Sequence, residues 1–169
     1  MSFDEKLREM MDKGATKGNF NGIKLSASQA QELCSGIQNR GEAKGLQCLW
    51  LGSCGIGDEQ VQAVIAALKE NGSSLEMLDL SSNSIGDTGA TTIADSFSRF
   101  PNLQELYLQC NSIGDTGAKA LAEAVPFCPR MIILFIDSNK HSAASETLID
   151  EAINGCKHIP GYNSQKHTA

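Results

Sequence analysis

A repeated pattern of leucines constrains the fold of this chain more than any other feature. The pattern Leu-x-x-Leu-x-Leu-x-x-(Asn/Cys)-x-Ile occupies Leu46–Ile56, Leu75–Ile85 and Leu103–Ile113, and a degraded copy occupies Met131–His141. Its third apolar position recurs at intervals of 29, 28 and 28 residues. A unit of this length cannot bury its apolar face alone and must stack on its neighbours. The chain is therefore predicted to form a solenoid.

A second pattern, with helical spacing, follows each leucine pattern. The residues that lie 5, 8, 9 and 12 positions after Ile85 are Ala90, Ile93, Ala94 and Phe97, and the neighbouring repeats keep these offsets. Such offsets mark one face of an α-helix. Each repeat is therefore expected to join a short strand to an amphipathic helix, which places the fold in the α/β class.

A Gly-Asp pair begins each predicted helix. Asp58, Asp87 and Asp115 are placed to cap helix N-termini, because a carboxylate oxygen accepts an unpaired backbone N–H and negative charge suits the helix dipole. A calcium site is the weaker alternative, since calcium needs six or more oxygen ligands around each ion. Capping is the interpretation we favour.

We expect one domain over residues 1–169. Residues 1–44 are predicted to form an N-terminal helix and a part-repeat cap, residues 45–154 to form four repeats, the last degraded, and residues 155–169 to form a C-terminal tail. The length is near the usual size of a single domain.

The predicted N-terminal cap rests on two short patterns. Phe3, Leu7 and Met10 recur at helical spacing, so a helix is expected to cover the first strand edge. Phe20 and Ile23 are predicted to lie in a degraded strand of the part-repeat.

Composition excludes several classes of partner. The formal charge of −6 disfavours nucleic acid, which binds basic surfaces. The first residues are charged and lack the apolar run of a secretory signal, and no segment is apolar over the length of a membrane span. The six cysteines form no dense framework of pairs, so we expect free thiols in a cytoplasmic or otherwise intracellular compartment.

Catalysis finds little support in the sequence. His141, His158 and His167 all lie at or beyond the degraded repeat, and Cys156 with His158 is the closest pair of sulfur and imidazole. Two such residues do not define a zinc site or an activated nucleophile. We therefore predict no enzyme activity, no cofactor and no metal site.

The repeats resemble a known family. The sequence Leu-Glu-Met-Leu-Asp-Leu-Ser-Ser-Asn-Ser-Ile-Gly-Asp-Thr-Gly-Ala at residues 75–90, and its near copy at 103–118, are similar to the ribonuclease-inhibitor-type leucine-rich repeats, which also occur in NOD-like receptors. The resemblance covers about Leu46 to Asn154, with the part-repeat extending it to about Phe20. It implies a short horseshoe arc with a parallel sheet on the concave side, helices on the convex side and protein recognition on the concave surface.

The resemblance also implies a structural role for the turn asparagines. Asn83, Asn111 and Asn139 match the family's asparagine and are expected to bond backbone groups inside the arc. Cys54 stands at that position in the first repeat.

Strand alternation predicts which residues face outward from the sheet. One outward column reads Trp50, Asp79, Tyr107 and Phe135, and it holds the only tryptophan of the chain. Exposed rings on a sheet are typical anchors of protein interfaces. The alternative is that the rings pack along one another and stabilise the sheet.

The predicted concave face is also acidic. Glu76, Asp79, Glu105 and Asp137 lie on it, and the outward set of the four predicted strands contains no Lys or Arg. This charge would suit a basic segment of a protein partner. The alternative is that it merely reflects the acidity of the whole chain.

The last predicted strand carries an apolar outward patch, made of Ile132, Ile133 and Phe135. A bare patch of this kind is uncommon on a monomer, so the C-terminal tail, a second copy or a partner is expected to cover it.

The sequence thus predicts a protein–protein interaction module with a protein ligand on its concave face. The alternatives are a self-associating structural subunit and a scaffold-type regulator of a GTPase or another enzyme. The predicted partner-binding residues are Trp50, Glu76, Asp79, Glu105, Tyr107, Ile133, Phe135 and Asp137.

Overall fold

The computed structural model describes residues 1–12, 14–39, 45–71 and 74–156. Within these residues one five-stranded sheet has the order β1-β2-β3-β4-β5, and every neighbouring pair is parallel. The strands are β1 (Lys17–Asn19), β2 (Cys48–Trp50), β3 (Met77–Asp79), β4 (Glu105–Tyr107) and β5 (Ile133–Phe135). The helices are α1 (Phe3–Met11), α2 (Ala27–Gln38), α3 (Asp58–Asn71), α4 (Asp87–Ala94), α5 (Asp115–Ala124) and α6 (Ala143–Cys156), with 3-10 turns η2 (Phe97–Arg99) and η3 (Val125–Phe127).

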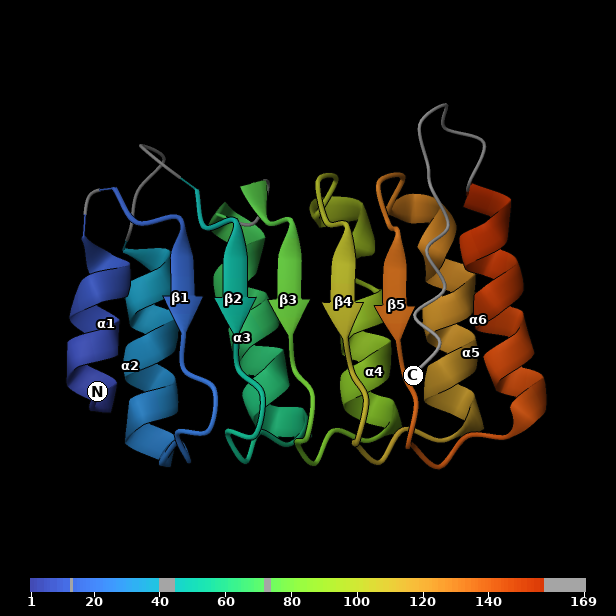
Figure 1. Cartoon of the computed structure of the whole chain (residues 1–169), viewed down its shortest axis with the longest axis horizontal. Helices are drawn as coiled ribbons and strands as arrows, with labels where there is room; N and C mark the ends of the chain where they lie inside the picture. Colours follow the sequence, from blue (N-terminus) through green and yellow to red (C-terminus); the bar gives the residue numbers. More distant parts are fainter. Residues whose placement is uncertain (13, 40–44, 72–73, 157–169) are drawn as a thin grey trace.

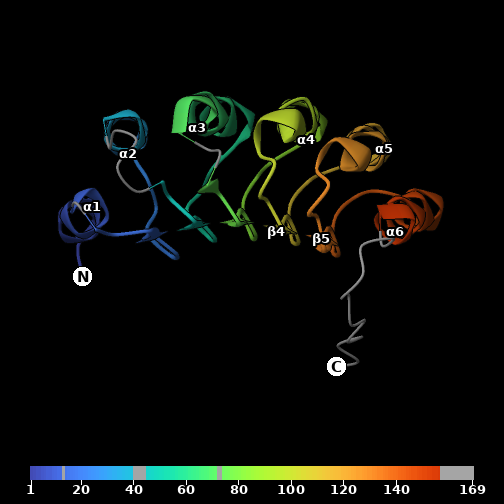
Figure 2. The ribbon, with the colours of Figure 1, turned by 90° about the horizontal axis from the view of Figure 1, so that it is seen from above.

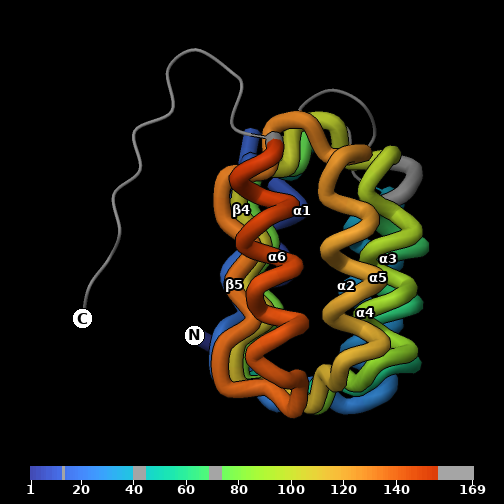
Figure 3. Tube along the Cα trace, turned by 90° about the vertical axis from the view of Figure 1, so that its right-hand side faces the viewer, coloured from blue at the N-terminus to red at the C-terminus, as the bar shows by residue number. Residues whose placement is uncertain are grey.

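Strands and helices alternate along the chain, so each repeat contributes one strand and one helix to two separate layers (Figure 1). The layers form an arc, in which the sheet lines the inner side and α2 to α5 form a row on the outer side (Figure 2). The terminal helices α1 and α6 lie nearer to the layer of the sheet than α2 to α5 do (Figure 3). The prediction of an α/β solenoid with a concave parallel sheet and convex helices is confirmed.

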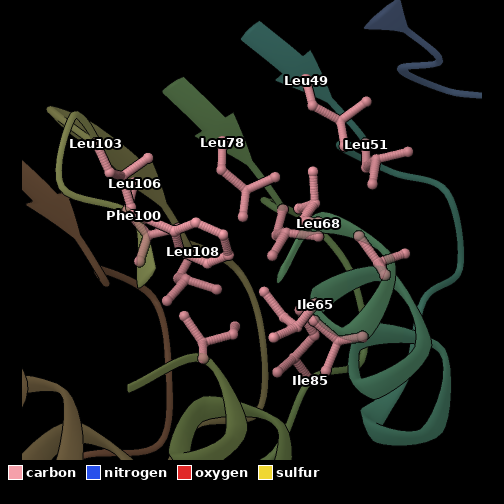
Figure 4. Packing of buried hydrophobic residues seen from close by; sticks show 14 of the residues in the cluster. Leu49, Leu51, Ile65, Leu68, Leu78, Ile85, Phe100, Leu103, Leu106 and Leu108 are labelled. Atoms are coloured by element: carbon pink, nitrogen blue, oxygen red, sulfur yellow. The ribbon is translucent and has the colours of Figure 1, made fainter. Parts of the chain in front are cut away.

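The leucines of the repeat fill the space between the two layers. The central residues of the strands, among them Leu49, Leu78 and Leu106, are fully buried, whereas their neighbours in the same strands are only half-buried. Ile65 and Leu68 of α3 approach these leucines from the helical layer (Figure 4). The predicted helix face is buried as well, so one continuous apolar core runs through the stack.

The turn asparagines join each repeat to the one before it. Asn83 Oδ1 accepts hydrogen bonds from the backbone N–H of Cys54 at 3.1 Å and of Ile56 at 2.9 Å. Its Nδ2 donates to the carbonyls of Leu51 at 2.8 Å and Leu80 at 3.0 Å. The amide thereby satisfies backbone groups of two repeats at once, which is the role that the family resemblance implied.

The other asparagine positions follow the same plan. Asn111 and Asn139 each donate to carbonyls of their own and of the preceding repeat. The thiol of Cys54 replaces the amide in the first of these turns and donates to the Phe20 carbonyl at 3.1 Å. A sulfhydryl is a weaker donor and a weaker acceptor than the amide of Asn83.

The aspartates cap helices, but not the helices that they begin. Asp58 is the first residue of α3, yet its Oδ1 accepts from the backbone N–H of Gly86 at 2.7 Å and of Gly89 at 3.1 Å, at the start of α4. Asp87 bonds the start of α5 in the same way, and Asp115 bonds Ser142 before α6. The simpler prediction that each aspartate caps its own helix is therefore wrong.

The geometry explains this difference. The N-cap residues of α4 and α5 are Gly86 and Gly114, which have no side chain to form a cap. The free amides of each helix are instead satisfied by a carboxylate from the preceding repeat. An added Cβ at Gly117 would lie 2.8 Å from Asp87 Oδ1, so a glycine is needed where this carboxylate approaches.

The N-terminal end differs in detail from the prediction. The first strand is Lys17–Asn19, so Phe20 and Ile23 follow the strand and do not form it. Phe20 is fully buried, like Leu51 after β2. The helix α1 lies beside this strand, and the centroid of its Phe3 ring is 5.7 Å from the centroid of the Phe20 ring.

At the other end, α6 continues through Gly155 to Cys156. The predicted start of the tail at residue 155 is therefore part of a helix. The rest of the predicted tail, including His158 and His167, lies outside the described residues.

Candidate protein-binding face

The strand register places two columns of side chains across the concave face. Each strand turns its central residue into the core and its first and last residues outward. The first column is Lys17, Cys48, Met77, Glu105 and Ile133, and the second is Asn19, Trp50, Asp79, Tyr107 and Phe135. Residues predicted to form one line from Trp50 to Phe135 are thus direct partners in the sheet.

The rings in the second column are partly accessible to solvent. Trp50 and Tyr107 are half-buried, and Phe135 is 45% exposed. Among the residues that the structure describes, the only ring-to-ring contact is that of Phe3 with Phe20. No stacked or tilted ring pair forms among Trp50, Tyr107 and Phe135 in the described part of the chain, although Tyr107 and Phe135 are direct partners in the sheet.

A hydrogen bond fixes the Tyr107 ring. Its hydroxyl donates to Glu105 Oε2 at 3.0 Å, two residues earlier on the same face of β4. Burial, followed by this bond and the negative charge of Glu105, raises the pKa of Tyr107 to about 12. The hydroxyl therefore remains neutral at physiological pH and is oriented by this hydrogen bond.

The carboxylate of Asp79 is also held in place. It accepts from the Ser81 backbone N–H at 2.9 Å and from Asn21 Nδ2 at 3.3 Å. Asn21 in turn accepts from the Gly52 N–H at 2.6 Å. An added Cβ at Gly52 would lie 3.0 Å from Ser81 Oγ, so the glycine leaves room for this network. Sequence reasoning missed Asn21, although it occupies the position in the first turn that Gly52 occupies in the second.

The charge of the face is less uniform than predicted. Glu76, Glu105 and Asp137 are half-buried on or beside the strands, but β1 adds Lys17 to the same column as Glu105. The outward set of the four clear repeats contains no Lys or Arg, as the sequence indicated, but the first strand lies at Lys17–Asn19 and adds a lysine that this set did not include. The acidic part of the face extends over β3 to β5, and the single lysine lies at the β1 edge.

The outermost strand presents the predicted apolar patch. Ile132 and Ile133 are half-buried, and Phe135 is exposed beyond them. Leu134 between them points inward and is 8% exposed. The patch is continuous with the aromatic column, so the apolar surface of the face increases toward β5.

In the described part of the chain, no group of three or more His, Cys, Asp or Glu residues is placed to hold a metal ion. Among the described cysteines, Cys110 is exposed, whereas Cys54 and Cys128 are buried. None of the described helices is both long and apolar enough to cross a bilayer.

Comparison with known proteins agrees with this architecture. Residues 73–94 and 101–122 match a family model described as Leucine Rich repeat. The tropomodulin C-terminal domain from Caenorhabditis elegans has a similar structure, with a TM-score of 0.75 and 15% identity over 92% of this chain and 93% of that one. The structure of leiomodin-1 actin-binding site 2 has a TM-score of 0.72 and 16% identity over 92% of this chain and 90% of that one.

These comparisons define the class of the protein. The matched segments are leucine-rich repeats, and the chain as a whole has the fold of a leucine-rich-repeat solenoid. The narrower assignment to the ribonuclease-inhibitor type stays a prediction.

Proposed function

We propose that this chain is a protein–protein interaction module that binds a protein ligand on its concave face, without catalysis or a cofactor. The observation that carries the proposal is the column of Trp50, Asp79, Tyr107 and Phe135, which spans four register-matched strands. Its rings are partly exposed, so part of their apolar area is available to a partner.

The arrangement favours binding in two ways. The rings are mounted on strands that are fixed by the core, and Tyr107 is further oriented by Glu105, so little side-chain freedom remains to be lost on association. Large rings at the centre of an interface can each contribute about 2 kcal/mol or more. The affinity is expected to depend chiefly on Trp50 and Tyr107.

The acidic side chains suit a partner segment that contains Lys or Arg. Asp79, Glu105 and Asp137 lie over β3 to β5, away from Lys17 at the β1 edge. A basic segment would therefore lie across the later strands, beside Tyr107 and Phe135. Charges of this kind mainly accelerate encounter and are screened by salt, so the association rate should fall as ionic strength rises.

Actin is the first purified partner to test. The structure named leiomodin-1 actin-binding site 2 matches 92% of this chain at a TM-score of 0.72. An intracellular location, as predicted from the cysteines, is part of the same proposal.

Affinity capture from a lysate of the source cell tests the proposal. The native chain would be compared with a Trp50→Ala/Tyr107→Ala variant and with a matched Gln31→Ala/Glu59→Ala variant, whose exposed residues lie on the convex helices α2 and α3. Circular dichroism would establish that all three are folded. A protein that the native chain and the convex variant retain, and the concave variant loses, is the expected result. Equal capture by all three would reject the concave face as the binding surface.

Purified actin, as monomers and as filaments, would be tested with the same three chains. Binding that depends on Trp50 and Tyr107 is expected if actin is the ligand. Absence of binding to both forms would exclude actin and leave the lysate capture to identify the partner.

Self-association is the second candidate, and the exposure of Phe135 on an outer strand favours it. Sedimentation equilibrium over a hundredfold range of concentration would detect it as a rise in mean mass that Phe135→Ser abolishes. A constant monomer mass would exclude it. A scaffold that regulates a GTPase or another enzyme is compatible with the fold, but no particular residue favours it.

A further inference from the structure

A second surface with the features of a docking site lies on the helical layer. A groove of about 450 Å³ opens between the C-terminal ends of α4 and α5 and the 3-10 turns that follow them. Its lining residues are Ala94, Asp95, Ser98, Ala120, Glu123, Ala124 and Phe127. It is remote in the fold from the concave columns, because helices and strands form opposite layers of the arc (Figure 2).

The groove has an apolar floor and an apolar rim. Ala94 and Ala124 are buried, and their small side chains leave room above them. Phe127 stands at the rim and is 65% exposed, the largest exposed fraction of any ring among the described residues. Adjacent apolar groups that are open to water would gain free energy if a partner covered them.

The repeat does not require phenylalanine at position 127. The equivalent residue one repeat earlier, 28 positions along the chain, is Arg99, and Arg99 is also exposed at the end of its 3-10 turn. The fold thus accommodates a charged side chain at this position. The exposed ring is a property of this groove and not of the leucine-rich repeat.

The polar rim of the groove is negative. Asp95 is the C-cap of α4, and Glu123 lies in the last turn of α5, where the helix dipole favours positive charge instead. Neither last turn contains a basic residue. Lys119 approaches Glu123 at 3.8 Å, but both side chains are well exposed and such a pair contributes little.

We propose that this groove docks a segment of a partner protein in which an apolar side chain is flanked by Lys or Arg. The apolar side chain would lie over Ala94 and Ala124 against Phe127, while the basic groups would face Asp95 and Glu123. Charge complementarity selects this occupant, because the lining contains two carboxylates and no basic residue. Acids that oppose the helix dipole in the free chain become favourable when a cation is bound.

Nuclear magnetic resonance titration of the full ¹⁵N-labelled chain tests the proposal. The probe is a synthetic twelve-residue peptide that alternates Leu pairs with Lys pairs, and its control has Glu in place of every Lys. The Lys peptide is expected to shift the amides of residues 94–98, 120–125 and 127, with weaker binding at high salt. The groove assignment is wrong if the Glu peptide produces the same shifts, or if the Lys peptide shifts only amides of the concave strands.

A Phe127→Arg variant supplies the decisive comparison, because it installs the residue that the preceding repeat already carries. Loss of the ring that the peptide would cover, and gain of a positive charge that repels Lys, should weaken binding of the Lys peptide by about tenfold or more. A matched Glu59→Gln variant on α3 should bind as the native chain does. Unchanged affinity of the Phe127→Arg variant, with its spectrum otherwise intact, would overturn the proposal.

Discussion

Replacement of Asp87 by alanine should destabilise the chain through the helix of the next repeat. The Oδ1 atom of this carboxylate accepts from the Gly114 N–H at 2.7 Å and the Gly117 N–H at 2.9 Å. Loss of an N-terminal cap costs about 0.5–2 kcal/mol, and loss of a negative charge at a helix N-terminus adds about 0.3–1 kcal/mol. Together these effects predict a decrease of about 2 kcal/mol in the free energy of unfolding.

The expected change in melting temperature follows from the chain length. A loss of 1 kcal/mol lowers the melting temperature of a chain of this size by about 2–4 °C, so Asp87→Ala should lower it by about 4–8 °C. Asp87→Asn retains an acceptor oxygen and should lose only about 0.5–1 kcal/mol, chiefly the contribution of the charge.

Urea unfolding followed by circular dichroism measures these differences, and Asp95→Ala is the matched control. Asp95 lies at the opposite end of the same helix, where a negative charge opposes the dipole, so its loss should change stability by less than about 0.5 kcal/mol or increase it slightly. Hydrogen exchange supplies a second readout, because the amides of Gly114 and Gly117 should exchange faster in Asp87→Ala. The reasoning is refuted if both variants have equal stability, or if accelerated exchange is confined to α4.

Three further predictions concern stability at low pH, the reactivity of the cysteine thiols and the cost of a core substitution. Hydrogen bonds from the Ser142 N–H and from neighbouring hydroxyls hold the pKa of Asp115 at about 2. The stability that ionised Asp115 contributes should therefore be complete above the ordinary carboxyl pKa and should disappear as the pH falls through about 2. A carboxyl NMR titration of the native and Ser142→Ala chains would measure this low pKa and its change. Iodoacetamide should modify Cys110 first and Cys54 only after unfolding, because burial raises the pKa of Cys54 to about 11; peptide mass spectrometry gives the order, and equal rates would contradict it. Leu106→Ala should cost about 2–5 kcal/mol by urea unfolding, since the residue is fully buried between the layers; a loss below 1 kcal/mol would contradict the assigned core.

Apolar periodicity was sufficient to predict the repeating unit. Leu49, Leu78 and Leu106 are buried at the centres of their strands, because alternation and helical spacing report directly which side of each element meets the core. The outward column from Trp50 to Phe135 follows from the same alternation. Strand alternation does not predict whether this column binds a protein, because that depends on the surface of the partner.

The bounds of the first strand could not be predicted in this way. Lys17, Gly18 and Asn19 include no leucine, and the strand is defined by its pairing with β2 and by α1 beside it. An added Cβ at Gly18 would lie 2.8 Å from Met10 Sδ, so close packing of α1 takes the place of the missing leucine. A local apolar pattern cannot indicate a contact with a separate helix, so Lys17 was not predicted to lie on the concave face.

The prediction of which helix each aspartate caps was wrong for a related reason. Capping rules relate a side chain to amides that are near in sequence, whereas Asp58 bonds amides 28 and 31 residues away. The residue type correctly indicated a cap, but only the stacked structure shows which helix receives it.

Site-specific photocrosslinking in the source cell tests the central claim most directly. A benzophenone amino acid would be placed at Met77, in the first concave column, or at Gln31, exposed on α2. We predict that the Met77 probe crosslinks a partner protein, that the Gln31 probe does not, and that Trp50→Ala/Tyr107→Ala abolishes the product. A partner that crosslinks only from Gln31, or equally from Met77 in the double variant, would contradict a concave binding face built on these two rings.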